Sequence, residues 1–219
     1  MFVIGIDPGL TRCGFGGVRR TRVGLEAVCH GVLATSADSP HPRRLSDLHR
    51  QLVALIVEHR PDVVVVERVF FQTNVRTAIG VSQASGLALA AADAAGCEIA
   101  QYTSNEVKLA VTGDGAADKK QTQAMVARTL KLSKLPRPFD AADALALAIH
   151  HLGMASYARL ASSSFGATPS APVAGGGIGN ARVATSFGGV RIAPANDRAR
   201  AMDRASTHTE PRANKEGGR

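Results

Sequence analysis

Short apolar runs separated by turns dominate the N-terminal part of the chain. Residues 2–7 (FVIGID) are apolar apart from a final acid, and residues 13–20 and 23–33 form two further runs around a short turn. Runs of this length between turn residues predict β-strands. Three such strands in close succession predict an antiparallel meander.

The pattern then alternates between helical and strand spacing up to about residue 152. Leucine and isoleucine recur at helical intervals over 42–59, and four valines over 63–66 predict a central strand covered on both faces. We also expect a strand over 96–102 and helices over 74–95, 104–111, 119–132 and 140–152. This order predicts an α/β fold, with a mixed five-stranded sheet flanked by helices on both faces.

The composition changes near Gly153. Ten of the 22 glycines lie from Gly153 onward, and the same segment carries nine Lys and Arg against four Asp and Glu, a net charge of +5. Such a segment buries too little apolar area to offset its ordering entropy. We expect a folded domain over 1–155 and a disordered, low-complexity basic tail over 156–219, acting either as a solvated linker or as an arm that holds DNA.

The whole chain has a net charge of +8 and a pI of about 10, which favours an anionic partner, either nucleic acid or an anionic membrane surface. No apolar run approaches the roughly 20 residues of a membrane helix, and the N-terminus lacks the basic region of a signal peptide. The three cysteines are widely spaced, which is typical of buried thiols in a reducing compartment. We therefore expect a cytoplasmic protein without a membrane partner.

Two acids follow predicted core strands. Asp7 ends the first strand and Glu67 follows the four valines. The carboxyl ends of strands are where sites gather on α/β sheets. The alternatives are a turn formed by Asp7, Pro8 and a Gly9 with positive φ, and a Glu67 that has simply reached solvent.

Asp140 and Asp143 lie three residues apart at the start of the last predicted helix. This spacing places both carboxyl groups on one helical face. The alternative is structural, with Asp140 as the N-cap and Asp143 at N3 of a capping pair.

Together, these four acids could meet at one point, where they would repel each other unless cations lay between them. Hard oxygen ligands without His or Cys suit Mg²⁺ or Mn²⁺. Two such ions about 4 Å apart activate water and stabilise the leaving oxygen in phosphodiester hydrolysis. The acids therefore predict a metal-dependent hydrolase that acts on a phosphodiester.

Four segments carry a resemblance to a known family. They are GIDPGLTRCGFG at 5–16, VVVVERVF at 63–70, NVRTAIGVSQASG at 74–86 and DAADALALAIHH at 140–151. In this order they resemble the RuvC-type crossover junction endodeoxyribonucleases. The resemblance implies a ribonuclease-H-like fold, a homodimer, and paired symmetric nicks across a four-way (Holliday) DNA junction in recombination and repair.

The resemblance also implies residue roles and partners. It assigns catalysis and binding of two Mg²⁺ ions per subunit, with Mn²⁺ as a substitute, to Asp7, Glu67, Asp140 and Asp143. It implies a partnership with the branch-migration complex, which consists of a junction-binding protein and its helicase motor. Family members prefer thymine-containing cut sites.

The resemblance points to further DNA-binding side chains. Phe70 would wedge against an unstacked base, although core packing is the alternative for one of the two adjacent phenylalanines. Lys108 and Lys119 would contact the scissile phosphate, and Lys120 would bind DNA beside them, although a solvated basic face is the usual interpretation. A basic track toward the acids would continue through Lys131, Lys134 and Arg137.

Small residues along 74–95 permit close helix approach, so this helix is either the dimer face or buried within one subunit.

Three other classes of protein remain as alternatives. An actin-like or sugar-kinase-like ATP-binding protein needs a second lobe and a second glycine-rich loop, for which TGDGAADK at 112–119 is a poor substitute. The others are a junction-binding module without catalysis and a nuclease of the same fold that processes ribosomal RNA.

Overall fold

The computed structural model of the chain describes residues 1–69 and 75–165. All five predicted strands are present within these residues: β1 (Phe2–Asp7), β2 (Arg12–Thr21), β3 (Gly24–Ala34), β4 (Val63–Glu67) and β5 (Glu98–Tyr102). The predicted helices are present as α1 (His41–His59), α2 (Val75–Ala94), α3 (Ser104–Thr112), α4 (Lys119–Thr129) and α5 (Phe139–Phe165).

The five strands form one mixed sheet in the order β3-β2-β1-β4-β5. Strands β1, β2 and β3 pair in antiparallel fashion, which confirms the predicted meander, whereas β4 pairs in parallel with both β1 and β5. Helix α1 carries the chain from the meander to β4, and α2 carries it from β4 to β5. The sheet is therefore parallel in its second half, where three carboxyl ends of strands meet at one edge.

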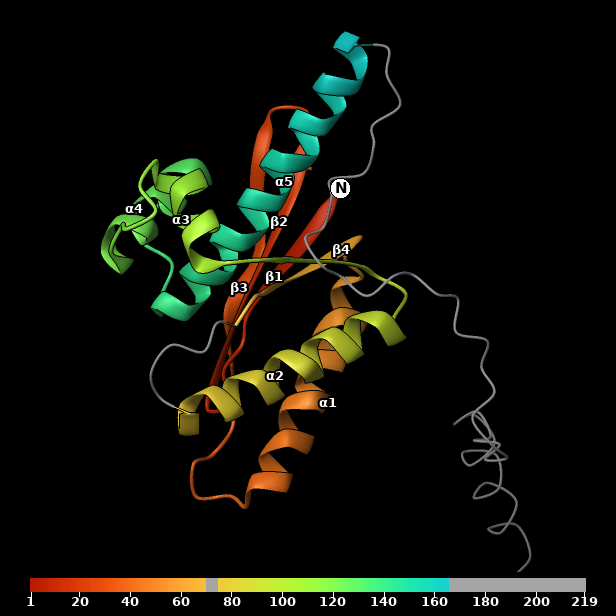
Figure 1. The fold of residues 1–219 in the computed structure, drawn as a ribbon, viewed down its shortest axis with the longest axis vertical. Helices are drawn as coiled ribbons and strands as arrows, with labels where there is room; N and C mark the ends of the chain where they lie inside the picture. The colour runs from red at the N-terminus through yellow and green to blue at the C-terminus, as the bar shows by residue number, and fades with distance from the viewer. Residues whose placement is uncertain (70–74, 166–219) are drawn as a thin grey trace, which may run out of the picture. The chain divides into compact units, whose positions relative to one another are not determined.

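Helices cover both faces of this sheet, as predicted. Helices α1 and α2 lie on one face, and α3, α4 and α5 lie on the other (Figure 1). The alternation of side chains along the strands divides the core accordingly. Ile4 and Val66 pack into the core below α1 and α2, whereas Val3 and Val65 pack into the core below α5.

The contact between α5 and the sheet depends on glycines that face the helix. A Cβ atom at Gly5 would lie 2.0 Å from the carbonyl oxygen of Ala144, and one at Gly14 would lie 2.1 Å from the carbonyl oxygen of Asp140. Real side chains cannot approach so closely, so glycine is required at both positions. These glycines let the first turns of α5 lie directly against β1 and β2, which fixes the height of its acids above the sheet.

Two helix ends differ from the prediction. Helix α5 runs to Phe165 rather than to 152, because residues 154–165 contain no proline or glycine and half of them are strong helix formers. A single glycine inside a helix costs about 1 kcal/mol relative to alanine and does not end it. Helix α4 ends at Thr129 rather than at 132. Lys131 has a left-handed φ of 53°, which is incompatible with a continuing α-helix.

Several other expectations concern the chain as a whole. No helix in the described part is both long and apolar enough to cross a membrane. The three cysteines are free thiols, and Cys13 is fully buried. The described residues form a single sheet with its helices, whereas the ATP-binding alternative requires two lobes. The predicted tail beyond Phe165 lies outside the described residues and stays a prediction.

Candidate active site

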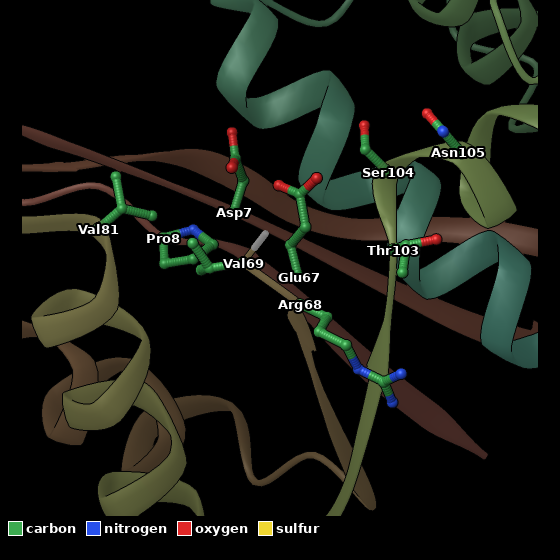
Figure 2. A pocket seen from close by; sticks show the side chains of 9 residues that line it. All are labelled: Asp7, Pro8, Glu67, Arg68, Val69, Val81, Thr103, Ser104 and Asn105. Atoms are coloured by element: carbon green, nitrogen blue, oxygen red, sulfur yellow. The ribbon is translucent and has the colours of Figure 1, made fainter. Parts of the chain in front are cut away.

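Asp7 and Glu67 lie side by side at the carboxyl ends of β1 and β4. These strands are parallel neighbours, with Ile6 opposite Val66, so the next residue of each strand reaches the same edge of the sheet. Their carboxyl groups point the same way into a cavity of about 670 Å³ (Figure 2). The cavity is also lined by Pro8, Arg68, Val69, Val81, Thr103, Ser104 and Asn105.

The turn after Asp7 differs from its structural interpretation. That interpretation required a positive φ at Gly9, but the described glycines with positive φ are Gly24, Gly96 and Gly113. A Cβ atom at Gly9 would instead lie 2.2 Å from the carbonyl oxygen of Arg12. The glycine is needed because the chain folds back tightly here, and this fold brings the start of β2 next to the Asp7 carboxyl.

Asp140 and Asp143 come to the same edge from α5. The helix begins at Phe139, so the two acids are its second and fifth residues and do not form the alternative capping pair. Each acid has a basic partner: the Arg12 guanidinium lies 2.9 Å from Asp140 and the Lys119 ammonium lies 3.6 Å from Asp143. The helix acids are therefore partly neutralised by side chains from β2 and α4.

A second, narrow cavity lies between one helix acid and one strand acid. Asp143 and Glu67 both line it, together with Ser104, Lys108 and Thr122. Glu67 and Ser104 also line the first cavity. The two hollows therefore meet at Glu67, and the described structure brings all four predicted acids to one edge of the sheet.

The electrostatics of Asp7 confirm that the four acids act on each other. The pKa of the Asp7 carboxyl is raised to about 9, mainly by burial and in addition by the charge of Glu67, a hydrogen bond with Glu67, and the charges of Asp143 and Asp140. Burial also raises the pKa of Asp143, but Lys119 opposes this shift. A carboxyl with these neighbours holds its negative charge at neutral pH only when a cation is bound nearby.

The donor set of this edge fits Mg²⁺ or Mn²⁺, because it consists of carboxylate oxygens with acceptor hydroxyl and amide groups around them. Within residues 1–69 and 75–165, however, no three Asp, Glu, His or Cys side chains are arranged to hold one ion. The two helix acids instead form ion pairs with Arg12 and Lys119. Metal binding would require these acids to exchange their basic partners for the ion.

The predicted DNA-binding residues divide into three groups. Lys108 and Lys119 lie beside Asp143, where both lower its pKa. Lys120 is exposed and makes no ion pair within the described residues, so its DNA-binding role stays a prediction. Phe70 lies outside the described residues.

Sequence reasoning missed Arg12 and Ser104 as site residues. Arg12 could have been found from the predicted meander, because antiparallel pairing of β1 with β2 sets Gly14 opposite Asp7 and brings the start of β2 to the acids. Ser104 follows the end of β5, whose Tyr102 is paired with Glu67. The end of a third parallel strand was therefore its signal.

Comparisons with known proteins agree with this architecture. The family model "Crossover junction endodeoxyribonuclease RuvC" matches residues 3–151. The chain is 56% identical to the protein of that name from Salinispora arenicola over 155 residues, which are 69% of this chain and 87% of the relative. It is 48% identical to the Leifsonia xyli protein over 186 residues, which are 83% of this chain and 88% of the relative.

A solved structure shares the fold. "T. thermophilus RuvC in complex with Holliday junction substrate" matches with a TM-score of 0.66 and 36% identity, over 74% of this chain and 97% of that one. This match confirms the predicted ribonuclease-H-like fold. With the family match over most of the described residues, it shows that the chain belongs to the RuvC family of crossover junction endodeoxyribonucleases.

Proposed function

We propose that this protein resolves four-way DNA junctions by paired symmetric nicks, in recombination and repair. The observation that carries the proposal is the convergence of four carboxylates at one sheet edge, where the pKa of Asp7 is raised to about 9. A buried acid of this kind is poised to bind cations rather than to stay ionised alone. The four acids come from β1, β4 and α5, the elements that carry three of the segments by which the chain resembles the family.

The four acids are the side chains that would hold the metal. Asp7 ends the central strand, and the charges of the three other carboxylates all raise its pKa. We therefore expect Asp7 to be the main ligand of the metal. Mg²⁺ held there, two ions per subunit or Mn²⁺ in their place, would supply an activated water and charge stabilisation for the leaving oxygen. Asp140 and Asp143 would complete this ligand set once Arg12 and Lys119 were released from them to bind the substrate.

The basic side chains around the acids then act on the DNA backbone. Lys108 lines the narrow cavity together with Asp143 and Glu67, and the Lys119 ammonium lies 3.6 Å from Asp143, so both lysines would face a phosphate bound at the acids. Arg12 is half-exposed on the other side of Asp140. Cations on both sides of the acid edge fix a phosphate in place and lower the cost of bringing it to four carboxylates.

Paired nicks require two such sites, and α2 offers a surface on which two subunits could meet. Ala84, Ala88, Ala91 and Ala92 are buried within one subunit, so monomer packing accounts for part of the small-residue pattern. Ile79, which is 52% exposed, shares the opposite face of α2 with Gly86 and Ala90. This face is a self-complementary candidate for a two-fold interface that would match the symmetry of the junction.

The proposed function also includes a partner, a location and a role for the basic tail. The branch-migration complex is the expected partner at the junction, the cytoplasm is the expected location, and the basic tail is expected to add weak, salt-sensitive DNA binding. Deletion of residues 166–219 is expected to leave nicking intact and to lower the salt dependence of binding.

The test compares three substrates in Mg²⁺: a synthetic four-way junction, a linear duplex with the sequence of one arm, and an RNA hairpin. We expect symmetric nicks in the junction alone, mapped on denaturing gels with each strand labelled in turn. Binding of the junction without nicking would favour a binding module without catalysis. Cleavage of the hairpin in preference to the junction would favour ribosomal RNA processing.

A further inference from the structure

A third hollow lies near the start of α5 and shares no lining residue with the two cavities of the acid edge. It has a volume of about 510 Å³ and is lined by Gln123 of α4 and by Arg137, Pro138 and Phe139, which lead into α5. Phe139 is 37% exposed, although large aromatic side chains usually bury most of their surface. The hollow therefore combines an aromatic ring, a proline ring and a guanidinium group.

This hollow adjoins the acids through α5. Phe139 and Asp143 are four residues apart in the helix, so their side chains lie on one face, about 5–6 Å apart at Cβ. Asp143 is in turn held by Lys119 from the first turn of α4. A strand whose phosphate lay over the acids and Lys119 would therefore have its neighbouring nucleotides near Phe139.

A buried hydrogen bond holds the wall of the hollow to α4. Gln123 is only 6% exposed, and its side-chain amide donates a hydrogen bond of 2.7 Å to the carbonyl oxygen of Pro136. This buried bond ties the segment before α5 to α4. Phe139 therefore presents its ring from a position that binding does not need to order, which favours affinity.

The chemistry of the three lining groups selects the occupant. An exposed aromatic ring next to a proline offers a flat apolar surface on which a nucleobase can stack. Arg137 beside it supplies the charge that a backbone phosphate requires. An apolar ligand would leave Arg137 without a partner, and a simple anion would leave the Phe139 ring in contact with water.

We propose that this hollow is a nucleotide subsite of the DNA-binding surface. It holds an unpaired nucleotide of the cleaved strand, with its base stacked on Phe139 and its phosphate bound by Arg137. The proposal rests on the proposed function, because it assumes a DNA strand at the acids. It assigns to Phe139 a role in binding the bases next to the branch point, where pairing is interrupted.

The first test measures junction binding by fluorescence anisotropy and nicking in the same samples. Phe139→Ala is expected to weaken binding about five- to tenfold, in line with the loss of one stacked base, and to slow nicking at subsaturating protein concentration by a similar factor. Phe139→Tyr keeps the ring and is expected to bind like the wild type. Phe139→Leu keeps only an apolar side chain and is expected to bind like Phe139→Ala.

Two controls separate stacking from other effects. Val57→Ala truncates an apolar side chain of α1 that is 61% exposed, and it is expected to change nothing. Arg137→Ala is expected to lower the slope of log Kd against log salt by about 0.9, as for one lost phosphate contact, whereas Phe139→Ala leaves the slope unchanged. Melting temperatures within 2 °C or so of the wild type would verify that the variants fold.

The second test places an abasic site at successive positions around the cut in the junction. For the wild type, one position is expected to weaken binding, and for Phe139→Ala the same position is expected to have no further effect. Wild-type affinity of Phe139→Ala, full affinity of Phe139→Leu, or additive effects of the abasic site would overturn the subsite. Wild-type protein that binds the junction without nicking it would instead contradict the proposed function and leave these binding differences readable.

Discussion

The two strand acids and the two helix acids of the site are in opposite electrostatic situations. Asp140 and Asp143 each have a basic partner, Arg12 and Lys119. Asp7 and Glu67 make no ion pair within the described residues, and each contributes to the electrostatic repulsion of the other. The helix acids are thus balanced within the protein, whereas the strand acids have no cation of their own.

This difference indicates which of the four acids depend most on a bound cation. Burial and the neighbouring carboxylates together raise the pKa of Asp7 to about 9, so folding at neutral pH requires this carboxyl to take up a proton or to bind a cation. The helix acids can instead exchange Arg12 and Lys119 for the ion without leaving a bare charge. The strand acids would therefore anchor the metal, and the helix acids would complete its shell.

The largest expected effect comes from Asp7→Asn. It should lower the nicking rate by roughly two to three orders of magnitude, as expected when one preorganised electrostatic group is lost from an active site. It should also raise the free energy of unfolding in metal-free buffer, because asparagine needs no proton uptake on folding. Junction nicking and chemical denaturation measure the two effects, with the exposed Asp38→Asn as the control.

A lower nicking rate together with a higher free energy of unfolding is the result expected if Asp7 is a metal ligand. If Asp7→Asn nicked the junction as fast as the wild type, the assignment of the strand acids as metal anchors would be wrong.

The next effect tests how the helix acids are held above the strand acids. Gly14→Ala places a Cβ atom 2.1 Å from the carbonyl oxygen of Asp140, so it should push the start of α5 outward. We expect it to destabilise the fold by about 1–3 kcal/mol, as for other overpacked positions, and to slow nicking. Urea denaturation and junction nicking measure the two effects.

Gly153→Ala is the matched control, because a Cβ atom there meets nothing within 4 Å. In the interior of α5 this substitution should stabilise the fold by about 1 kcal/mol. Equal effects of the two substitutions would show that the close contact at Gly14 does not position α5.

The smallest effect compares two adjacent lysines. Lys119→Met removes the partner of Asp143, which changes the free energy of unfolding by less than about 1 kcal/mol, as for other exposed ion pairs. Because Lys119 lowers the pKa of Asp143, the rise of the nicking rate with pH should move to higher pH.

Lys120→Met should leave that pH profile unchanged and lower only the salt dependence of junction binding. If both substitutions moved the profile equally, the specific role of Lys119 beside Asp143 would be refuted.

The fold was predictable because its local signals agree with each other. The runs at 2–7 and 63–66 are short, β-branched and bounded by turn residues, so they predict strands whatever their partners. Both runs end in an acid, and this placed Asp7 and Glu67 at the edge of the sheet. The family segments then linked these strands to the start of α5.

Other features could not be predicted, because they depend on contacts between distant elements. The partnership of Arg12 with Asp140 spans 128 residues and follows from the register of β1 and β2. The exposure of Phe139 depends on how α4 and α5 pack, and a local apolar pattern predicts burial for it. The end of α5 was misplaced because Gly153 was taken as a boundary, although an isolated glycine is tolerated within a helix.

The most direct test of the account measures the free energy of unfolding against pH, with and without millimolar Mg²⁺, for the wild type and Asp7→Asn. The pKa of Asp7 is raised by folding, so folded protein binds a proton that the unfolded chain releases, and the stability contributed by Asp7 falls as pH rises from 3.8 to about 9. His150 and His151, whose pKa values are lowered by burial, act in the opposite direction, because the stability that they contribute rises with pH. The difference between wild type and Asp7→Asn removes their contribution.

Without metal, this difference should favour Asp7→Asn increasingly toward pH 9. With Mg²⁺ the wild type should regain its stability, because the ion binds the folded carboxylates and not the unfolded chain. A difference that does not change with pH, or that Mg²⁺ leaves unaltered, would contradict a metal site anchored on Asp7 and Glu67.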